Sequence, residues 1–364
     1  MNNNPPLSGP APISGGTTTP ARPAVTGAPQ QLGLQFTGTA NEYFRIWIVN
    51  TCLTLLTLGI FSAWAKVRKK RYFYSHTRLD GTPFQYLGQP IPILKGRLIA
   101  AGLFAVWYAA THYVTILLPF VLVAAFLLAP WVVVRAAAFN ARYSAFRNMT
   151  FSFTGTYLGA AKIMYGWAIV TLLTLGIAFS WWAQRMKRFM VRHMAYGGID
   201  GEFTASGGQF FKTYLIAGLL FIGAVFGISM LSGAGIALAG KSNSTIITVI
   251  VLIVMYSIYV MVYAYAQARI TNLVWNSTQL GPVNFVSTIG ARGLLGLYVT
   301  NALGILLSAG LLIPWATIRT LKYRADHFSV VATGDLNQLE GGDDSNVRAA
   351  GAEVGEFFDF DMSI

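Results

Sequence analysis

The sequence predicts an all-α integral membrane protein: three repeats of a re-entrant or interfacial helical hairpin with short flanking β-strands, plus two transmembrane helical hairpins. Composition is the first reason, because 54% of the 364 residues are hydrophobic and only 11% are charged, whereas soluble domains carry about 25% charge. The second reason is that residues 98–134 hold no charged residue and 213–268 hold only Lys241. A span needs about 20 apolar residues, so we expect a hairpin in each stretch, the first with shorter helices turning near residues 111–113.

The third reason is an internal repeat, whose equivalent positions carry the same kinds of residue in three copies. These positions hold a glycine (Gly59, Gly176, Gly310), a tryptophan (Trp64, Trp181, Trp315), two cations (Arg68 and Arg71, Arg185 and Arg188, Arg319 and Lys322) and a histidine (His76, His193, His327). Short segments with alternating Phe, Thr and Val stand before and after each copy. Such alternation predicts short strands, which we expect in small aqueous sheets or hairpins.

The repeats and apolar stretches divide the chain into seven parts. They are an N-terminal tail (1–31), repeat 1 (32–96), transmembrane hairpin 1 (97–148), repeat 2 (149–212), transmembrane hairpin 2 (213–280), repeat 3 (281–335) and an acidic C-terminal tail (336–364). Both tails are expected to be disordered, because they lack the apolar residues that a folded core needs.

The distribution of positive charge favours four spanning helices. If all seven apolar segments crossed the membrane, the 26 Lys and Arg residues would divide 17 to 9 between its two sides. If the three repeat segments instead turned back at Gly59, Gly176 and Gly310, the division would be 25 to 1, with Lys241 alone outside. The second arrangement fits the accumulation of cations on the cytoplasmic side much better. Half-segments of about 15 residues reach about 22 Å, which is too short for a hydrocarbon core of about 30 Å.

The segments TLLTLGI (54–60), WAKVRKKRYFYSHTR (64–78) and DGTPFQYLG (80–88) resemble the YjgN-like family of bacterial inner-membrane proteins. The resemblance extends over roughly residues 32–335. It implies a multi-pass protein of the bacterial inner (plasma) membrane. The family is defined by a domain of unknown function, so the resemblance brings no catalytic residue and no substrate. The third copy departs from the pattern, because Pro314 precedes its tryptophan and its basic run is thin.

In each repeat the tryptophan and the two cations fall on one stripe of a helix, given 3.6 residues per turn. We call these three sets the basic collars: Trp64, Arg68 and Arg71; Trp181, Arg185 and Arg188; Trp315, Arg319 and Lys322. Two interpretations are open. The collars can be interfacial anchors, with the indole at headgroup depth and the cations facing phosphates, or they can form a binding site for an anionic lipid or anionic solute.

Two further patterns suggest ligands. His76, His193 and His327 stand at equivalent positions, and three histidines can bind zinc with one position left open. The cations nearby oppose a metal, so we favour interfacial histidines and expect no cofactor. GIALAGKS (235–242) matches the spacing of a phosphate-binding loop. Long apolar runs flank it and no acidic residue lies near it, so we favour a glycine-rich turn of a membrane hairpin.

No pairing of a nucleophile with a base is visible, and no Asp or Glu lies inside an apolar segment. We therefore expect a non-enzymatic scaffold or a component that interacts with anionic membrane lipids. The acidic tail, which ends in EFFDFDMSI, is expected to be solvated and disordered. The alternative is that it docks on a partner protein or on the basic collars of the same chain. Nucleic acid is excluded as a partner, because the cations are clustered between apolar runs rather than spread over a solvated face. The alternatives are a permease or channel for a small polar or anionic solute, and a metal-dependent enzyme in which the three histidines converge.

Overall fold

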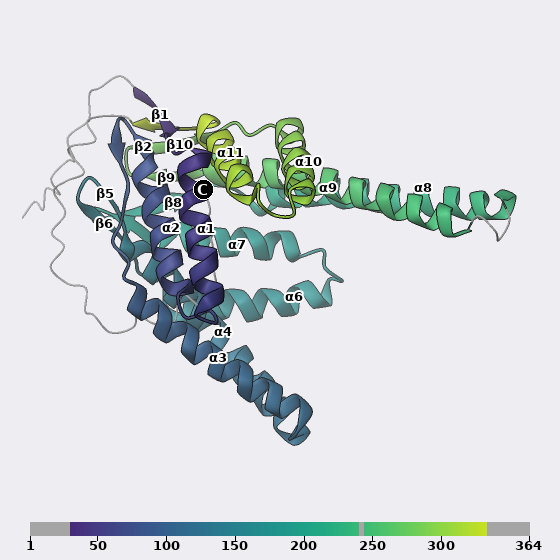
Figure 1. Ribbon diagram of the computed structural model, residues 1–364, viewed down its shortest axis with the longest axis horizontal. Coiled ribbons are helices and arrows are strands. Elements are labelled where there is room, and N and C mark those ends of the chain that lie inside the picture. Colours follow the sequence, from purple (N-terminus) through teal and green to yellow (C-terminus); the bar gives the residue numbers. More distant parts are fainter. Residues whose placement is uncertain (1–29, 240–243, 333–364) are drawn as a thin grey trace, which may run out of the picture.

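The computed structural model describes residues 30–239 and 244–332. The expectations for the two tails and for Lys241 concern residues outside these ranges. Figure 1 shows the strands gathered at one end of the molecule, with helical hairpins extending from them. Two of these hairpins reach much farther than the others, as the two charge-poor stretches predict.

The described chain alternates strands with pairs of helices. The strands are β1 (Gln30–Phe36), β2 (Thr77–Leu79), β3 (Thr82–Pro83), β4 (Gln85–Tyr86), β5 (Ser144–Phe146), β6 (Met149–Phe153), β7 (Met194–Tyr196), β8 (Ile199–Phe203), β9 (Thr278–Leu280), β10 (Val283–Ser287) and β11 (Phe328–Ala332). The helices are α1 (Ala40–Leu56), α2 (Ser62–His76), α3 (Pro90–His112), α4 (Leu118–Tyr143), α5 (Tyr157–Ala161), α6 (Trp167–Leu173), α7 (Phe179–Arg192), α8 (Gly207–Ala239), α9 (Ser244–Asn276), α10 (Ala291–Leu307) and α11 (Ile313–Asp326). A short 3-10 turn, η1 (Thr115–Leu117), precedes α4, and a π-helical turn, η2 (Lys162–Gly166), joins α5 to α6.

The prediction of an all-α protein is wrong, because the strands of the described chain form a single sheet. Its order is β3-β2-β1-β11-β10-β9-β8-β7-β6-β5-β4, and all pairs are antiparallel. The first strand pairs with the last, and the end strands β3 and β4 are separated along the chain by Phe84 alone. The sheet is therefore a nearly closed barrel. Strands of two to seven residues show too little alternation to reveal that they belong to one sheet.

Every helical hairpin lies between two strands that pair with each other: β1 with β2, β4 with β5, β6 with β7, β8 with β9, and β10 with β11. One backbone hydrogen bond of 2.9 Å recurs at each base. It joins Thr37 to His76, Leu87 to Tyr143, Thr154 to His193, Thr204 to Ser277 and Thr288 to His327, the first donating its N–H to the carbonyl of the second. The described chain thus contains five units of one topology, and each hairpin returns to the edge of the barrel from which it leaves.

The repeated glycines are the turns of the three short hairpins, as predicted. Gly59, Gly176 and Gly310 have φ angles of +93°, +90° and +92°, a region in which L-residues are strained. The amide of Gly59 donates to the carbonyl of Thr54 across 2.8 Å, and the hydroxyl of Thr57 accepts the N–H of Phe61 across 2.9 Å. Equivalent bonds recur in the other two copies. The segment with a hydroxyl residue two positions before the glycine, TLGI in the first two copies and SAGL in the third, is therefore a helix-reversal signal.

The inside of the barrel is packed with apolar side chains. Its buried cluster comprises Leu32, Leu34, Leu79, Phe146, Tyr196, Val283, Ala325 and Val330. Phe84 completes this cluster at the gap in the sheet, where its ring centroid lies 4.7 Å from that of Phe146. Small barrels are generally filled by their own side chains in this way.

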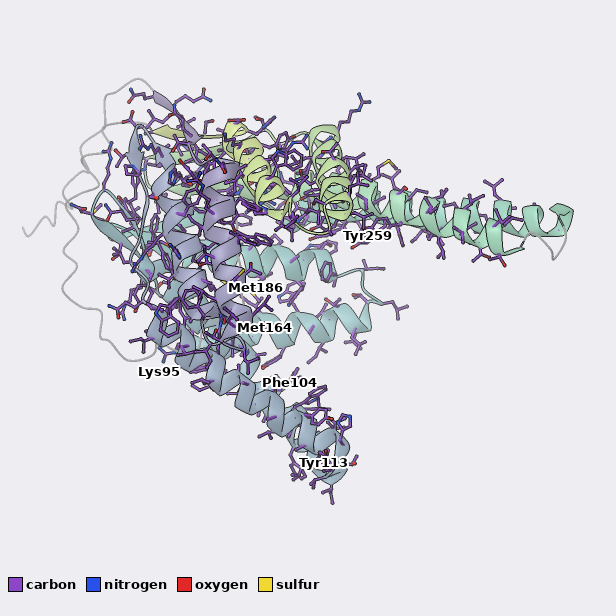
Figure 2. The ribbon with its side chains drawn as sticks, viewed as in Figure 1. Lys95, Phe104, Tyr113, Met164, Met186 and Tyr259 are labelled. Atoms are coloured by element: carbon purple, nitrogen blue, oxygen red, sulfur yellow. The ribbon has the colours of Figure 1, made fainter. Side chains whose placement is uncertain are left out.

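The helices α3, α4, α8 and α9 are long and apolar enough to cross a membrane. Their surfaces carry large exposed apolar side chains, such as Phe104, Tyr113 and Tyr259 (Figure 2). In the most apolar stretches of α8 and α9, only 6% and 0% of the residues are buried within the protein. This exposure is expected for helices that face lipid. The first arms α1 and α10 have 17 residues each, or about 25 Å, which is less than the thickness of the hydrocarbon core.

Candidate functional site

The basic collars lie on the second arms of the three short hairpins, α2, α7 and α11, between the turns and the barrel. Each arm runs from its apolar turn through the tryptophan and the two cations to the histidine, which immediately precedes the next strand. Trp64 and Trp315 are 36% and 37% exposed. The predicted stripe is thus present on each arm, but the three collars have different surroundings.

Collar 1 ties its hairpin to the next one. The guanidinium of Arg71 donates to the carbonyl oxygen of Gly88, just before α3, across 3.2 Å. The neighbouring Lys70 donates to the amide oxygen of Asn140 on α4 across 3.1 Å. One N–H of Arg71 is therefore engaged in holding two hairpins together.

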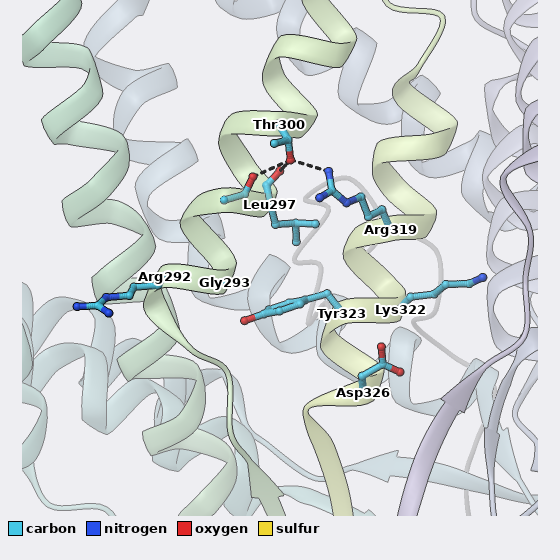
Figure 3. A pocket seen from close by; sticks show the side chains of 9 residues that line it. Arg292, Gly293, Leu297, Thr300, Arg319, Lys322, Tyr323 and Asp326 are labelled. Atoms are coloured by element: carbon cyan, nitrogen blue, oxygen red, sulfur yellow. Dashed lines mark hydrogen bonds between the residues drawn. The ribbon is translucent and has the colours of Figure 1, made fainter.

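Collar 3 borders a cavity of about 440 Å³ between α10 and α11 (Figure 3). Arg319 donates to the hydroxyl of Thr300 across 2.5 Å, and its guanidinium lies 5.1 Å from the ring centroid of Trp315. Arg292 and Lys322 extend outward on opposite sides of the cavity (Figure 3). Asp326 adds a carboxylate to the lining. The cations of this cavity therefore do not converge on one point.

Collar 2 borders a larger cavity, of about 600 Å³, between α7 and the chain that runs from β8 into α8. Arg185 and Arg188 line it together with Arg192, which the sequence analysis missed. On a helix of 3.6 residues per turn, Arg192 lies about 20° from Trp181 and so falls on the collar stripe. The periodicity that picked out the other collar residues could have identified it.

The walls of the collar 2 cavity are built by close packing. A Cβ on Gly207 would lie 2.3 Å from Cδ1 of Trp181, so only glycine lets the indole pack there. A Cβ on Gly201 would likewise lie 2.3 Å from the carbonyl oxygen of Val191. The buried side chain of Gln184 donates to the carbonyl oxygen of Ala205 across 2.8 Å. These contacts fix α7 against the start of α8.

The electrostatics of the collar 2 cavity favour an anion. Within the described chain, Nε of Arg188 is buried and has no hydrogen-bond acceptor, which is unusual for a buried donor. The guanidinium of Arg185 lies 5.5 Å from the ring centroid of Trp167. Glu202 is the acidic residue of the lining. The first turn of α8 adjoins the cavity at Gly207, and the N-terminus of a helix attracts negative charge.

The three histidines end their helices. Nδ1 of His76, His193 and His327 lies 2.7, 2.8 and 2.8 Å from the carbonyl oxygen four residues earlier. Each histidine carbonyl in turn accepts the threonine N–H at the hairpin base. The described residues contain no group of three His, Cys, Asp or Glu side chains that could hold a metal ion. The helix-to-strand junction explains why the histidine recurs.

The carboxylate of Glu42 makes contacts at the base of the first hairpin. The hydroxyl of Tyr72 donates to Oε2 of Glu42 across 3.0 Å, and Nε2 of His76 lies 3.9 Å from the same oxygen. The hydrogen bonds from Tyr72, and then from Thr39, lower the pKa of the Glu42 carboxyl. Glu42 is therefore held as a carboxylate beside the basic collar.

The GIALAGKS stretch begins in the last turns of α8, which includes residues 235–239, and residues 240–243 fall outside the described ranges. A nucleotide-binding phosphate loop is a turn that follows a strand, whereas here a long helix leads into the motif and includes its first five residues. The part described therefore supports the favoured interpretation of a membrane hairpin.

Comparison with known proteins agrees with this architecture. Residues 31–357 match the family described as "Bacterial protein of unknown function (DUF898)". The chain is 47% identical over 53 residues to "Inner membrane protein YjgN" of Salmonella typhimurium, covering 15% of this chain and 13% of that protein. It is 38% identical over 73 residues to the protein of the same name from Escherichia coli K12, covering 20% and 17%. The matched part thus spans less than a fifth of either relative, and no solved structure matches the chain.

The family match covers most of the chain, the curated relatives are inner-membrane proteins, and four helices can cross a bilayer. The chain therefore belongs to the DUF898 family and is a multi-pass inner-membrane protein.

Proposed function

We propose that this protein is a non-enzymatic scaffold of the inner membrane that holds anionic lipid headgroups at the bases of its helical hairpins. The observation that carries the proposal is the order of surfaces along each short hairpin. Exposed apolar turns such as Leu58 and Leu175, 95% and 93% exposed, are followed by the collar and then by the barrel. An apolar tip belongs in hydrocarbon, whereas tryptophan and cations belong at headgroup depth.

The short hairpins act in this proposal as re-entrant anchors. Their arms are too short to cross the hydrocarbon core, and both ends of each hairpin join the same barrel. The two long hairpins cross the membrane, which leaves the barrel and all three collars on one side. Positive charge accumulates on the cytoplasmic side of inner-membrane proteins, so we place the barrel there.

The packed barrel counts against the rival role of a permease or channel. Apolar side chains from strands around the ring fill the space along its axis. The two cavities described above lie at the bases of the hairpins rather than along the spanning arms.

Native mass spectrometry after reconstitution with equal amounts of phosphatidylglycerol and phosphatidylcholine tests the proposal. We expect the protein to retain the anionic lipid preferentially. The preference should be lost when the six collar cations Arg68, Arg71, Arg185, Arg188, Arg319 and Lys322 are replaced by glutamine. Arg78→Gln, on an exposed position of β2, is the control and should leave it unchanged. Equal retention of both lipids by the unaltered protein, or saturable uptake of a small anion by proteoliposomes, would contradict the scaffold role.

A further inference from the structure

We propose that the cavity between α7 and the β8–α8 segment is a site for one phosphate group, contributed by the headgroup of a membrane lipid. This inference rests on the proposed function and deepens it, because it assigns the specific binding of a lipid headgroup to one of the three collars. It rests on the presence of Arg185, Arg188 and Arg192 in the lining of a single cavity of about 600 Å³.

The equivalent positions in the other repeats show why this collar differs. The position of Arg192 is occupied by Ser75 in repeat 1 and by Asp326 in repeat 3. Repeat 2 therefore presents three guanidinium groups along one stripe, whereas repeat 3 places a carboxylate at the same point of its cavity. Guanidinium groups form strong, directional hydrogen bonds with phosphate oxygens.

Arg188 is also less engaged with the protein than Arg71 and Arg319 of the other two collars. Arg71 donates to Gly88, and Arg319 donates to Thr300. Arg188, by contrast, has a buried Nε with no acceptor in the described part of the protein. A phosphate oxygen that entered the cavity would offer this acceptor after a turn of the Arg188 guanidinium, because Nε itself is closed to solvent.

The backbone around the cavity adds to the positive potential. Ser206 and Gln209 cap the start of α8 reciprocally: the N–H of Ser206 donates to Oε1 of Gln209 across 2.9 Å, and the N–H of Gln209 donates to Oγ of Ser206 across 3.4 Å. This fixes the N-terminus of a 33-residue helix beside the arginines, where its dipole favours an anion. Glu202 lies in the same lining and opposes a ligand of high negative charge.

A lipid is the expected source of the phosphate because the cavity wall includes an apolar surface. Trp181 lines the cavity and stacks on Phe211 of α8, with ring centroids 4.9 Å apart. The apolar arms of α7 and α8 continue from this pair toward their turns. A bound phospholipid could therefore place its phosphate among the arginines and its acyl chains along the arms.

Titration of the purified full-length protein in detergent tests the inference, with dihexanoyl phosphatidylglycerol and inorganic phosphate as separate probes. We expect saturable binding of the lipid. Arg192→Ser, the residue of repeat 1, should weaken it by about fivefold, given the contribution of one interfacial cation. Arg188→Gln should weaken it by roughly tenfold, because a charge-assisted hydrogen bond is lost as well.

Two further variants separate binding from folding. Glu202→Gln should strengthen binding, because it removes a negative charge from the lining, and a damaged fold would not produce that result. Lys212→Gln, at an exposed position of α8 outside the cavity, is the matched control for lost charge and should leave binding unchanged. Thermal unfolding without ligand should show that Arg192→Ser is as stable as the unaltered protein.

The two probes distinguish the sources of the phosphate. The pattern of variant effects with the lipid, and weak binding of inorganic phosphate, would support the inference. The same pattern with inorganic phosphate alone would overturn the lipid assignment in favour of a soluble phosphorylated ligand. If the affinity for the probes were the same in Arg192→Ser and Glu202→Gln as in the unaltered protein, the assignment of the site to this cavity would be overturned. The lipid-retention experiment can fail while this one succeeds, since the former measures all three collars and the latter a single cavity.

Discussion

The side-chain amide of Asn301 donates a hydrogen bond to the carbonyl oxygen of Ala316 across 3.3 Å, joining the two arms of the third hairpin. The same amide group donates to Oγ1 of Thr320 across 3.1 Å, and Oδ1 of Asn301 accepts from Arg319 across 3.4 Å. Asn301 is 7% exposed. This buried residue therefore connects the position of the collar cation to the packing of the hairpin.

Replacement of Asn301 by alanine should lower the thermal unfolding midpoint. The buried hydrogen bonds of the Asn301 side chain are lost, and the carbonyl of Ala316 keeps only the hydroxyl of Thr320 as a side-chain donor. We therefore expect a cost of about 1–3 kcal/mol. Asn50→Ala is the comparison. Asn50 makes the equivalent bond to Ala65 across 3.4 Å, but its Oδ1 has no partner among the described residues, so its loss should cost less. An equal or larger effect of Asn50→Ala would contradict the assignment.

Replacement of Gly176 by alanine should destabilise the second hairpin through its backbone alone. The φ angle of +90° is unfavourable for alanine by about 1–2 kcal/mol, and a Cβ there would meet no atom within 4 Å. Gly102→Ala is the control, because a Cβ there is also unobstructed and the residue lies in helix α3. Differential scanning fluorimetry in detergent should show a lower midpoint for Gly176→Ala and an unchanged or higher midpoint for Gly102→Ala.

Replacement of Gly207 by alanine should disturb the collar 2 cavity. The new Cβ would lie 2.3 Å from the Trp181 ring, whereas a Cβ on the adjacent Gly208 would lie 3.9 Å from its nearest neighbour. We expect Gly207→Ala to displace the indole, change tryptophan fluorescence and weaken lipid binding by roughly tenfold, as loss of a well-packed anchor does. Gly208→Ala should behave like the unaltered protein, and matching losses in both variants would refute this account of the wall.

The lowered pKa of Glu42 predicts a dependence of stability on pH. A carboxyl whose pKa is lower in the folded state stabilises the fold above its unfolded pKa, near 4.5, and this contribution is lost as pH falls through the lowered folded value. Glu42→Gln imitates the protonated form. Its unfolding midpoint should lie below that of the unaltered protein at pH 7, and the two should approach each other at pH 3. A constant difference between pH 3 and 7 would contradict the prediction.

Much of the helical architecture could be predicted from the sequence. Gly59, Gly176 and Gly310 indicated the three turns, because their φ angles near +90° strain residues that carry a Cβ. Charge-poor runs indicated the long hairpins. The closed sheet could not be predicted, because its pairings join residues far apart in the chain, such as Gln30 and Ala332. The sequence also did not reveal that the long and short hairpins have the same topology. Leu87 and Tyr143 form the same basal backbone bond as Thr37 and His76, although neither residue type is shared.

The collars were identified by periodicity, but their differences were not. Arg71 and Arg188 occupy equivalent positions, yet one meets the carbonyl of Gly88 and the other borders a cavity. That distinction depends on the helix that follows each repeat, and so on tertiary packing. The histidines, unlike the collar cations, have the same surroundings in all three repeats. Their exact recurrence was compatible with a shared ligand, but each histidine ends its own helix.

Cysteine accessibility labelling tests the central claim that all hairpins leave and return on one face of the membrane. The native Cys52 is exposed on α1 and is first replaced by serine. Single cysteines are then placed at the exposed positions Ser75, Asp200 and Asp326, near the barrel, and at Tyr113, at the tip of a long hairpin. An impermeant thiol reagent should label Tyr113→Cys from the periplasmic side and the other three only after the cytoplasmic side is opened. Labelling of any of the three from the same side as Tyr113→Cys would contradict the account.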